Sequence, residues 1–292
     1  MAVVNMMKNK PAAGQLADFL EGVSIEVMPR TAAKVEDFTE ILPAGTRVYI
    51  AHIEGTPIEE MTDTAKRLAD GGFEVMPHFP ARIIKDDATL KEWVDRYVSE
   101  AGVETALLLG GSPTKPVGTL DSSIQLLETG YFDGFKRLHV AGHPEGNPDI
   151  DAKGQTANVD EALRWKQAYA DKSDIDMAIV TQFVFDAKPM IDWAERLEQM
   201  GITMPVHAGV AGPAKLQTLI KYAIACGVGP SLNVLQKRAK DLTKLMKPFE
   251  PTEVLTELAA YKAENPDSLI ERAHVFPLGG IKNSAQYIRD NG

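Results

Sequence analysis

One carboxylate, Glu26, lies inside a short apolar run, between Ile25 and Val27. Burial of a charged carboxylate is costly unless the group is paired or protonated. If the run is a strand, alternation places Ser24, Glu26 and Met28 on one face of it. A carboxyl group held in apolar surroundings has a raised pKa and can act as a general acid. We therefore take Glu26 as a candidate catalytic acid; the alternatives are a structural salt bridge or an outward-facing side chain.

All of the histidines also fall in short apolar runs, and they are His52, His78, His139, His143, His207 and His274. A catalytic metal is not expected, because no His-x-His pair occurs and no acidic cluster accompanies the histidines. His139 and His274 lie early in their runs, and we expect them to be structural. The other four lie late in their runs and could line a ligand pocket.

Other polar strings follow the ends of these runs. The first is Gly110-Gly111-Ser112-Pro113, and paired glycines let a planar or phosphorylated ligand approach the backbone. The others are Gly142–Pro148 and Thr181–Asp186, and Gln182 in the latter can offer both donors and acceptors to a heterocycle. The sequence holds no P-loop, no Gly-x-Ser-x-Gly elbow, no Cys-x-x-Cys and no Gly-x-Gly-x-x-Gly motif. Any dinucleotide must therefore bind without a Rossmann domain.

The elements that must position these residues are short buried strands. Eight such runs, bounded by Gly and Pro, span Val23–Pro29, Arg47–Ile53, Glu74–Phe79, Thr105–Gly111, Arg137–His143, Asp176–Phe185, Met204–Val210 and His274–Gly280. Between them lie amphipathic helical patterns, including Pro57–Gly71, Thr89–Ala101, Asn158–Asp171 and Pro189–Met200. Eightfold alternation predicts an α/β fold with a closed (β/α)₈ barrel, in which active sites occupy the carboxyl ends of the strands.

The barrel is expected to span residues 21–292 as a single domain, after an N-terminal extension of residues 1–20. The segment from Pro213 to Arg272 holds about three helical patterns, which predicts extra helices before the last strand. Cys226 ends one of these patterns, so we expect it to be a buried structural residue.

Composition restricts the classes of function. The chain has 292 residues, 44% of them hydrophobic, and a formal net charge of -10, which disfavours nucleic acid as a partner. No apolar run reaches the ~18 residues of a membrane helix, and the N-terminus lacks the apolar part of a secretory signal. A single cysteine fits a reducing compartment. We expect a cytoplasmic protein with small-molecule partners; a homo-oligomer is left open.

Taken together, the strings resemble those of the methylenetetrahydrofolate reductases. Ser24–Thr31 resembles that family's Ser-Phe-Glu-Phe-x-Pro-Pro-Arg opening, and Pro77-His78 its Pro-His pair. The remaining matches are Ala141–Pro148 to Ala-x-Tyr-Pro-Glu-x-His-Pro, Thr181–Asp186 to Thr-Gln-Phe-Phe-Phe-Asp, and Pro205–Val210 to Pro-Ile-x-Pro-Gly-Ile. The matches occur in the family's order over roughly residues 20–235.

The resemblance implies a (β/α)₈ barrel that usually holds FAD, which is reduced by NAD(P)H and passes hydride to 5,10-methylenetetrahydrofolate. It makes Glu26 the catalytic acid and Gln182 the contact to folate and nicotinamide. Leu216 and Ser112 are further expected substrate contacts. Cofactor contacts are expected, by position, at His52, His78, Leu109, Gly110, Gly111, His143 and Asn147, with Lys166 as a phosphate contact.

This chain departs from the family pattern at several points, as a divergent member would. The family's Arg-Gly-Asp after the fourth strand is Gly110-Gly111-Ser112 here, and its fifth-strand Tyr and His are His143 and Asn147. The last run also lacks the family's Tyr-Thr-Leu-Asn. Because Ser112 cannot replace a carboxylate on the pterin edge, we expect Glu54 to serve there. The alternatives are flavin-independent hydride transfer from NAD(P)H, methyl transfer from methyltetrahydrofolate, and a non-catalytic folate-binding subunit.

Overall fold

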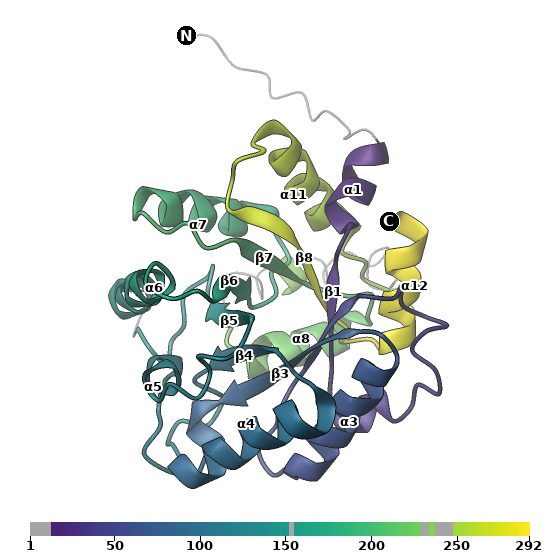
Figure 1. Ribbon diagram of the computed structural model, residues 1–292. Helices are drawn as coiled ribbons and strands as arrows, with labels where there is room; N and C mark the ends of the chain where they lie inside the picture. The colour runs from purple at the N-terminus through teal and green to yellow at the C-terminus, as the bar shows by residue number, and fades with distance from the viewer. Residues whose placement is uncertain (1–12, 152–154, 229–233, 237–247) are drawn as a thin grey trace.

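A computed structural model describes residues 13–151, 155–228, 234–236 and 248–292 (Figure 1). Its strands close into one barrel in chain order, and every neighbouring pair is parallel. They are β1 Ser24–Val27, β2 Arg47–Ile50, β3 Glu74–Pro80, β4 Thr105–Leu109, β5 Arg137–Gly142, β6 Asp176–Thr181, β7 Val206–Ala211 and β8 Ile270–Phe276. The predicted (β/α)₈ barrel is confirmed.

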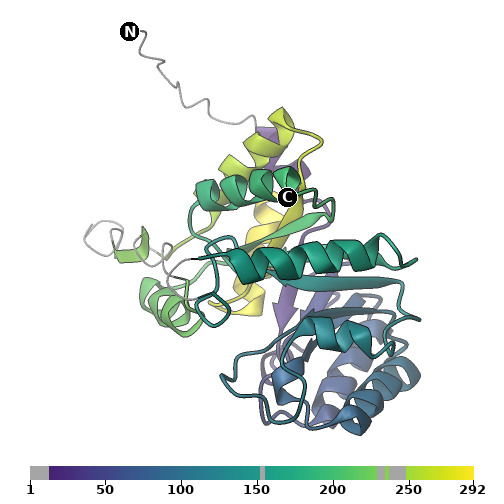
Figure 2. The same cartoon turned by 90° about the vertical axis from the view of Figure 1, so that its left-hand side faces the viewer.

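Helices surround this barrel, and Figure 2 shows α6 and α7 crossing its near face in teal and green. The described helices are α1 Ala13–Leu20, α2 Pro29–Ala32, α3 Ile58–Asp70, the 3₁₀ turn η1 Ala81–Ile83, α4 Asp87–Ala101, α5 Ser123–Glu128, α6 Ala157–Ala170, α7 Ala187–Gln199, α8 Leu216–Ala225, α11 Thr252–Glu264 and α12 Ile281–Asn291. None of these helices, in the part of the chain that the structure describes, is long and apolar enough to cross a membrane.

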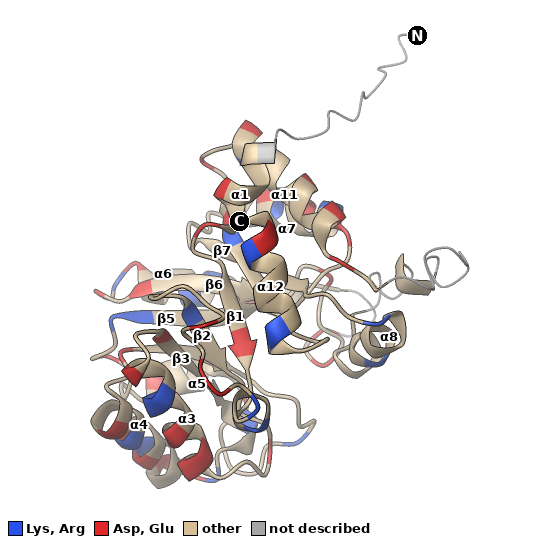
Figure 3. Cartoon of the chain, turned by 90° about the vertical axis from the view of Figure 1, so that its right-hand side faces the viewer, with Lys and Arg blue, Asp and Glu red and all other residues tan. Residues whose placement is uncertain are grey.

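Local sequence explains where a helix begins and ends, and α4 shows this clearly. The Asp86 side chain accepts a hydrogen bond from the Thr89 amide at its start, and Gly102 adopts a left-handed conformation at its end. Its buried face carries the apolar residues of the predicted pattern, Leu90, Trp93, Val94 and Tyr97. Figure 3 shows charged residues on α3 and α4 and a red, acidic segment in β1.

The two faces of the strands meet different surroundings. Outward residues such as Ile25, Val48 and Val140 join the large core beneath the helices. Inside the barrel, Tyr49 packs in a small apolar cluster with Met76, Leu107 and Val180. The barrel interior therefore has its own core, and it supports the carboxyl ends of the strands, where the site is expected.

Polar side chains also occur inside the barrel, and they bond to one another. The Tyr49 hydroxyl lies 2.6 Å from His139 Nδ1, and the Ser24 hydroxyl lies 2.9 Å from His274 Nδ1. Ser24 and His274 are opposite each other across the β1–β8 pair, so their bond helps to close the barrel.

The last strand differs from its prediction. It runs Ile270–Phe276 rather than His274–Gly280. The prediction missed its first half because the charged residues Glu271 and Arg272 interrupt the apolar run by which the strand is recognised. His274 is therefore not early in its strand: it makes the structural contact with Ser24 and also lines the cavity described below.

His207 is the opposite case. It is the second residue of β7, fully buried at the amino end of the barrel, and its Nε2 lies 2.9 Å from Glu271 Oε2. The prediction that His207 lies late in its strand and lines a pocket is wrong. The predicted run began two residues too early, at Met204, which moved His207 toward the strand's end.

Extra helices do precede β8. Of the three expected between Pro213 and Arg272, α8 and α11 are described, and the rest of that prediction falls on residues 229–233 and 237–247, outside the described residues. The described part of the N-terminal extension is α1, which packs against α11. Residues 1–12 of that extension lie outside the described residues.

Candidate active site

A cavity of about 1110 Å³ opens at the carboxyl ends of the strands. Its wall includes most of the residues singled out from the sequence: Glu26, His52, Glu54, His78, Leu109, Gly110, Gly111, Ser112, His143, Asn147 and Gln182. Two others do not line it. Leu216 is buried in an apolar cluster with Phe183 and Phe185, and Lys166 is buried on α6.

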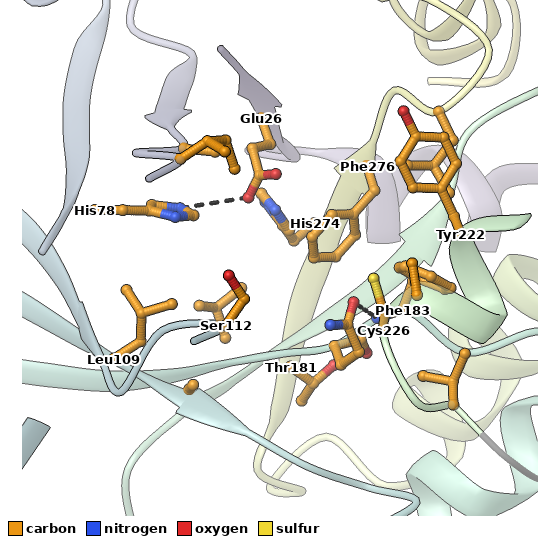
Figure 4. A pocket seen from close by; sticks show the side chains of 18 of the residues that line it. Glu26, His78, Leu109, Ser112, Thr181, Phe183, Tyr222, Cys226, His274 and Phe276 are labelled. Atoms are coloured by element: carbon orange, nitrogen blue, oxygen red, sulfur yellow. Dashed lines mark hydrogen bonds and ion pairs between the residues drawn. The ribbon is translucent and has the colours of Figure 1, made fainter. Parts of the chain in front are cut away.

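Glu26 projects from β1 into this cavity, toward His78 (Figure 4). Its side chain is 20% exposed, and that surface faces the cavity rather than bulk water. Burial raises the pKa of Glu26 to about 8. The carboxyl group is therefore mostly protonated at neutral pH, as a general acid requires.

His78 is the nearest polar partner of Glu26. Its Nε2 lies 3.3 Å from Glu26 Oε2, in a contact that lacks the geometry of a hydrogen bond. Burial, with a smaller effect of His52, lowers the pKa of His78 to about 3. The contact is thus between a neutral imidazole and a protonated carboxyl group, and it is not an ion pair at neutral pH.

The floor below Glu26 is also neutral. His274 lines the cavity beside Glu26 in Figure 4, and burial holds its pKa well below the usual range. Its ring packs against Tyr49 at 4.5 Å between centroids, and burial raises the pKa of the Tyr49 hydroxyl. Because these groups offer no positive charge, they do not compensate ionisation of Glu26, and the raised pKa follows.

The wall across from Glu26 is formed by the end of β4 and the residues after it. Leu109 and Ser112 occupy this position in Figure 4. Gly111 has a φ of +95°, and a Cβ there would lie 2.9 Å from Pro80 Cβ. Only glycine fits this conformation and contact without strain, so the wall at this point is main chain without a side chain.

Gln182 follows β6 on another side of the cavity. Its side-chain oxygen accepts a hydrogen bond from the Phe183 amide at 3.1 Å, and its backbone amide donates to the Gly142 carbonyl at 3.0 Å. These bonds fix the side chain, so its NH₂ group is the part left to donate to a ligand.

His52 lies at the end of β2 but is largely engaged by protein groups. Its ring packs on Trp93 with centroids 4.4 Å apart, and its Nε2 lies 3.0 Å from the Thr56 carbonyl. A neutral imidazole donates in such a contact, because burial lowers the pKa of His52. Glu54, two residues later, is exposed in a turn at the cavity rim.

A second cluster of polar side chains lies at the end of β5, around His143. The Asn147 side-chain nitrogen lies 3.5 Å from His143 Nε2. Burial and the nearby charge of Lys166 lower the pKa of His143 to about 4, and burial lowers the pKa of Lys166 to about 8. A buried lysine beside a cavity wall gains stability when an anion approaches it.

The sequence reasoning missed one edge of the cavity. Cys226 is exposed and lines the cavity together with Tyr222 and Ile224, so the expectation of a buried structural cysteine is wrong. The helix ends at Ala225, and Gly227 has a φ of +68°, so Cys226 lies in the turn beyond the helix. The glycine after Cys226 was the signal for this helix end.

An acid with a raised pKa at the carboxyl end of a (β/α)₈ barrel marks this cavity as the candidate active site. No protein-family model matches the chain. The sequence is similar to "Methylenetetrahydrofolate reductase 1" of Schizosaccharomyces pombe, with 28% identity over 152 residues. This match confirms the predicted resemblance to the methylenetetrahydrofolate reductases. It covers 49% of this chain and only 23% of the yeast protein.

The fold also matches that of solved structures. One is an uncharacterized protein from Clostridium thermocellum that binds two copies of 5-methyl-5,6,7,8-tetrahydrofolic acid. It aligns over 94% of this chain and 96% of its own, with a TM-score of 0.59 and 13% identity. At that identity the likeness bears on the barrel fold alone.

Proposed function

We propose that this protein reduces 5,10-methylenetetrahydrofolate to 5-methyltetrahydrofolate with NAD(P)H as the reductant. The observation that carries the proposal is Glu26, a carboxylic acid whose pKa is raised to about 8 in the wall of a large cavity. The similarity to a methylenetetrahydrofolate reductase supports the choice of substrate.

The chemistry requires an acid at this place. The methylene bridge between N5 and N10 of the folate accepts hydride poorly until N10 is protonated and the ring opens to a 5-iminium cation. Glu26 donates that proton, and the carboxylate that remains stabilises the cation. His78 stays neutral beside it, so no positive charge opposes formation of the cation.

Other residues orient the substrate. The wall at Gly110 and Gly111 carries no side chains and so leaves room for a planar ring face, and the Gln182 NH₂ group donates to a ring heteroatom or carbonyl. Glu54, at the rim, is our proposed partner for the amino-pyrimidine edge of the pterin, which suits a carboxylate. Holding donor and acceptor in contact supplies much of the remaining rate.

The described residues fit a bound FAD in space and charge. The cavity of about 1110 Å³ exceeds the ~300–1,000 Å³ of an ordinary small-molecule site. Lys166 does not line the cavity, but it is a buried cation close enough to the lining residue His143 to lower its pKa, so its charge would favour a phosphate at this side of the wall. FAD, when bound, supplies a hydride carrier between nicotinamide and folate.

A second candidate is direct hydride transfer from NAD(P)H without a flavin. The observation that favours it is that two side chains expected to contact the flavin already contact other protein groups. The His52 ring packs at a tilt on Trp93 and is bonded to the Thr56 carbonyl, and His78 faces Glu26. Full activity of a colourless, flavin-free preparation would establish this route, whereas visible flavin absorbance and dependence on added FAD would support the first.

The test of the function is NAD(P)H oxidation by the purified protein with 5,10-methylenetetrahydrofolate, with 5-methyltetrahydrofolate measured as the product. No product with either nicotinamide would refute the proposal. Binding of 5-methyltetrahydrofolate without turnover would instead indicate a folate-binding subunit, and consumption of methyltetrahydrofolate with a thiol acceptor would indicate a methyltransferase.

A further inference from the structure

The cavity wall opposite Glu26 is built from main chain. Gly110 and Gly111 contribute no side chains, and Ser112 contributes a small one. A glycine segment has more conformational freedom than any other, so its position must be fixed from outside. The group that fixes it is Arg82, in the turn that follows the neighbouring strand β3.

Arg82 bonds this segment along its length. Its backbone amide donates to the Gly110 carbonyl at 2.9 Å, and its carbonyl accepts from the Val117 amide at 2.8 Å. Its guanidinium Nη1 donates to the Pro113 carbonyl at 3.3 Å. Arg82 therefore holds the segment before, within and after the turn that contains Ser112.

The guanidinium is itself anchored by Asp121. Arg82 Nε donates to Asp121 Oδ1 at 2.5 Å and to the Asp121 carbonyl at 3.1 Å. The Asp121 amide in turn donates to the Gln125 side chain at 2.6 Å, next to the capping box of Ser122 and Gln125 that begins α5. The side chain of Arg82 is 14% exposed and that of Asp121 is 58% exposed, so the arginine is fixed in place by protein groups although its partner reaches solvent.

A side chain at Gly110 would be in van der Waals contact with this anchor. A Cβ at Gly110 would lie 3.4 Å from the Asp121 carbonyl oxygen and 3.9 Å from Arg82 Nε. A Cβ at Gly118 would lie 2.0 Å from the Lys85 carbonyl oxygen, which no side chain can do. The wall thus has one position, given by the end of β3 and the start of α5 rather than by its own side chains.

We propose that Arg82 is a positioning residue, which sets the distance between the glycine wall and Glu26 and so determines how tightly the planar heterocycle of the substrate is held. This inference rests on the proposed function for the identity of the heterocycle. Arg82 also lines the cavity itself, but its role here is exerted through the backbone of residues 110–117, so a raised KM without faster exchange of that segment would overturn the proposal in favour of direct contact with the ligand. The proton transfer from Glu26 does not depend on Arg82.

The experiment compares Arg82→Met and Arg82→Lys with Arg96→Met as a matched control. Arg96 also bonds two carboxylates, Glu59 at 2.6 Å and Glu100 at 2.7 Å, but it links α4 to α3 and does not line the cavity. Steady-state NAD(P)H oxidation gives KM for methylenetetrahydrofolate and kcat over a range of pH. Hydrogen exchange of residues 110–121 reports the mobility of the wall.

Arg82→Met is expected to raise KM at least about tenfold, because a displaced wall misplaces the bound ring. The pH at which kcat falls should stay at its wild-type value, since Glu26 keeps its surroundings. Arg82→Lys should give an intermediate KM, and Arg96→Met should leave KM and the exchange of residues 110–121 unchanged. Faster exchange of the wall in Arg82→Met with an unchanged KM would overturn the proposal, as would equal effects of Arg82→Met and Arg96→Met.

If the wild-type protein reduces no methylenetetrahydrofolate, the proposed function fails, and the positioning role is then decided by equilibrium binding of 5-methyltetrahydrofolate. Weaker binding by Arg82→Met than by Arg96→Met supports it. Equal affinity of Arg82→Met and the wild type would contradict it, whatever the catalytic activity is.

Discussion

Replacing Glu26 with glutamine removes the acidic proton but keeps the size and polarity of the side chain. Burial raises the pKa of the wild-type carboxyl group from an ordinary glutamate value of 4.5 to about 8. At pH 7 a group with that pKa is protonated in about nine molecules of ten, whereas an unperturbed glutamate is protonated in roughly one of three hundred. Burial thus raises the supply of the acid form by more than two orders of magnitude.

The sign of the pH dependence follows from this. Since the protonated form is the active one, folate reduction should be constant below pH ~7 and should fall about tenfold per pH unit above pH ~8. Glu26→Gln should lose at least ~10²-fold in kcat, the usual scale of general acid catalysis, and its residual rate should show no fall near pH 8.

The assay is steady-state NAD(P)H oxidation with methylenetetrahydrofolate between pH 6 and 9.5, with Glu104→Gln as the control. Glu104 pairs with Lys136 at 2.5 Å on the surface, so its loss should change neither the rate nor the profile. Near-wild-type turnover by Glu26→Gln would refute the acid role. A wild-type profile that rises between pH 7 and 9 would refute the assignment of the protonated form.

Three further outcomes are expected. Glu54→Gln should raise KM for the folate several-fold and leave the pH profile unchanged, because Glu54 is an exposed rim residue; an unchanged KM would end its assignment to the pterin edge. Lys166→Met should weaken binding of the phosphate-bearing cofactor by about tenfold, measured by titration with FAD and with NAD(P)H. If the variant binds each cofactor as tightly as the wild type does, Lys166 has no part in the site. Glu26→Gln should raise the free energy of unfolding above that of the wild type by more at pH 9 than at pH 5. The ionised form is destabilised by up to about 5 kcal/mol, from the shift of the pKa from 4.5 to about 8. The stability of the wild type is thus highest below pH ~4.5 with respect to this group and declines up to pH ~8. Urea unfolding of the wild type and of Glu26→Gln at pH 5 and pH 9 measures this. A difference in unfolding free energy between the two proteins that is the same at both pH values would contradict the reasoning.

Much of the barrel could be predicted because its signal is local. Short β-branched runs between amphipathic helices indicate parallel strands whatever their neighbours are, and most of the expected cavity residues followed directly from the rule that the carboxyl ends of such strands carry the site. The same rule failed where strand ends were misread. Glu271 and Arg272 interrupt β8, so its apolar pattern began near its middle, and His274 was placed too early.

The electrostatic state of the site could be predicted only in part. The apolar neighbours of Glu26 in the sequence indicated burial and hence a raised pKa. That His78 is a neutral partner, and that His274 lies beneath Glu26, depends on strands separated by many residues in the chain. Pairing of this kind is set by barrel closure, which no short window of sequence reports.

The surroundings of the glycine wall also depend on residues that are distant in the sequence. Read as a motif, Gly110-Gly111-Ser112 looks like the loss of an arginine and an aspartate that the resembling family carries at these positions. In the fold, an arginine and an aspartate do stand beside the wall, but they come from positions 82 and 121. Because Arg82 and Asp121 occupy the space next to Gly110, a larger residue at position 110 would press on the Asp121 carbonyl and the guanidinium. The glycine and the displaced ion pair are therefore coupled, and Gly110→Arg should weaken folate binding more in the wild type than in Arg82→Ala, where the space has been vacated. Purely additive changes in affinity across this double-mutant cycle would show that the two positions are independent.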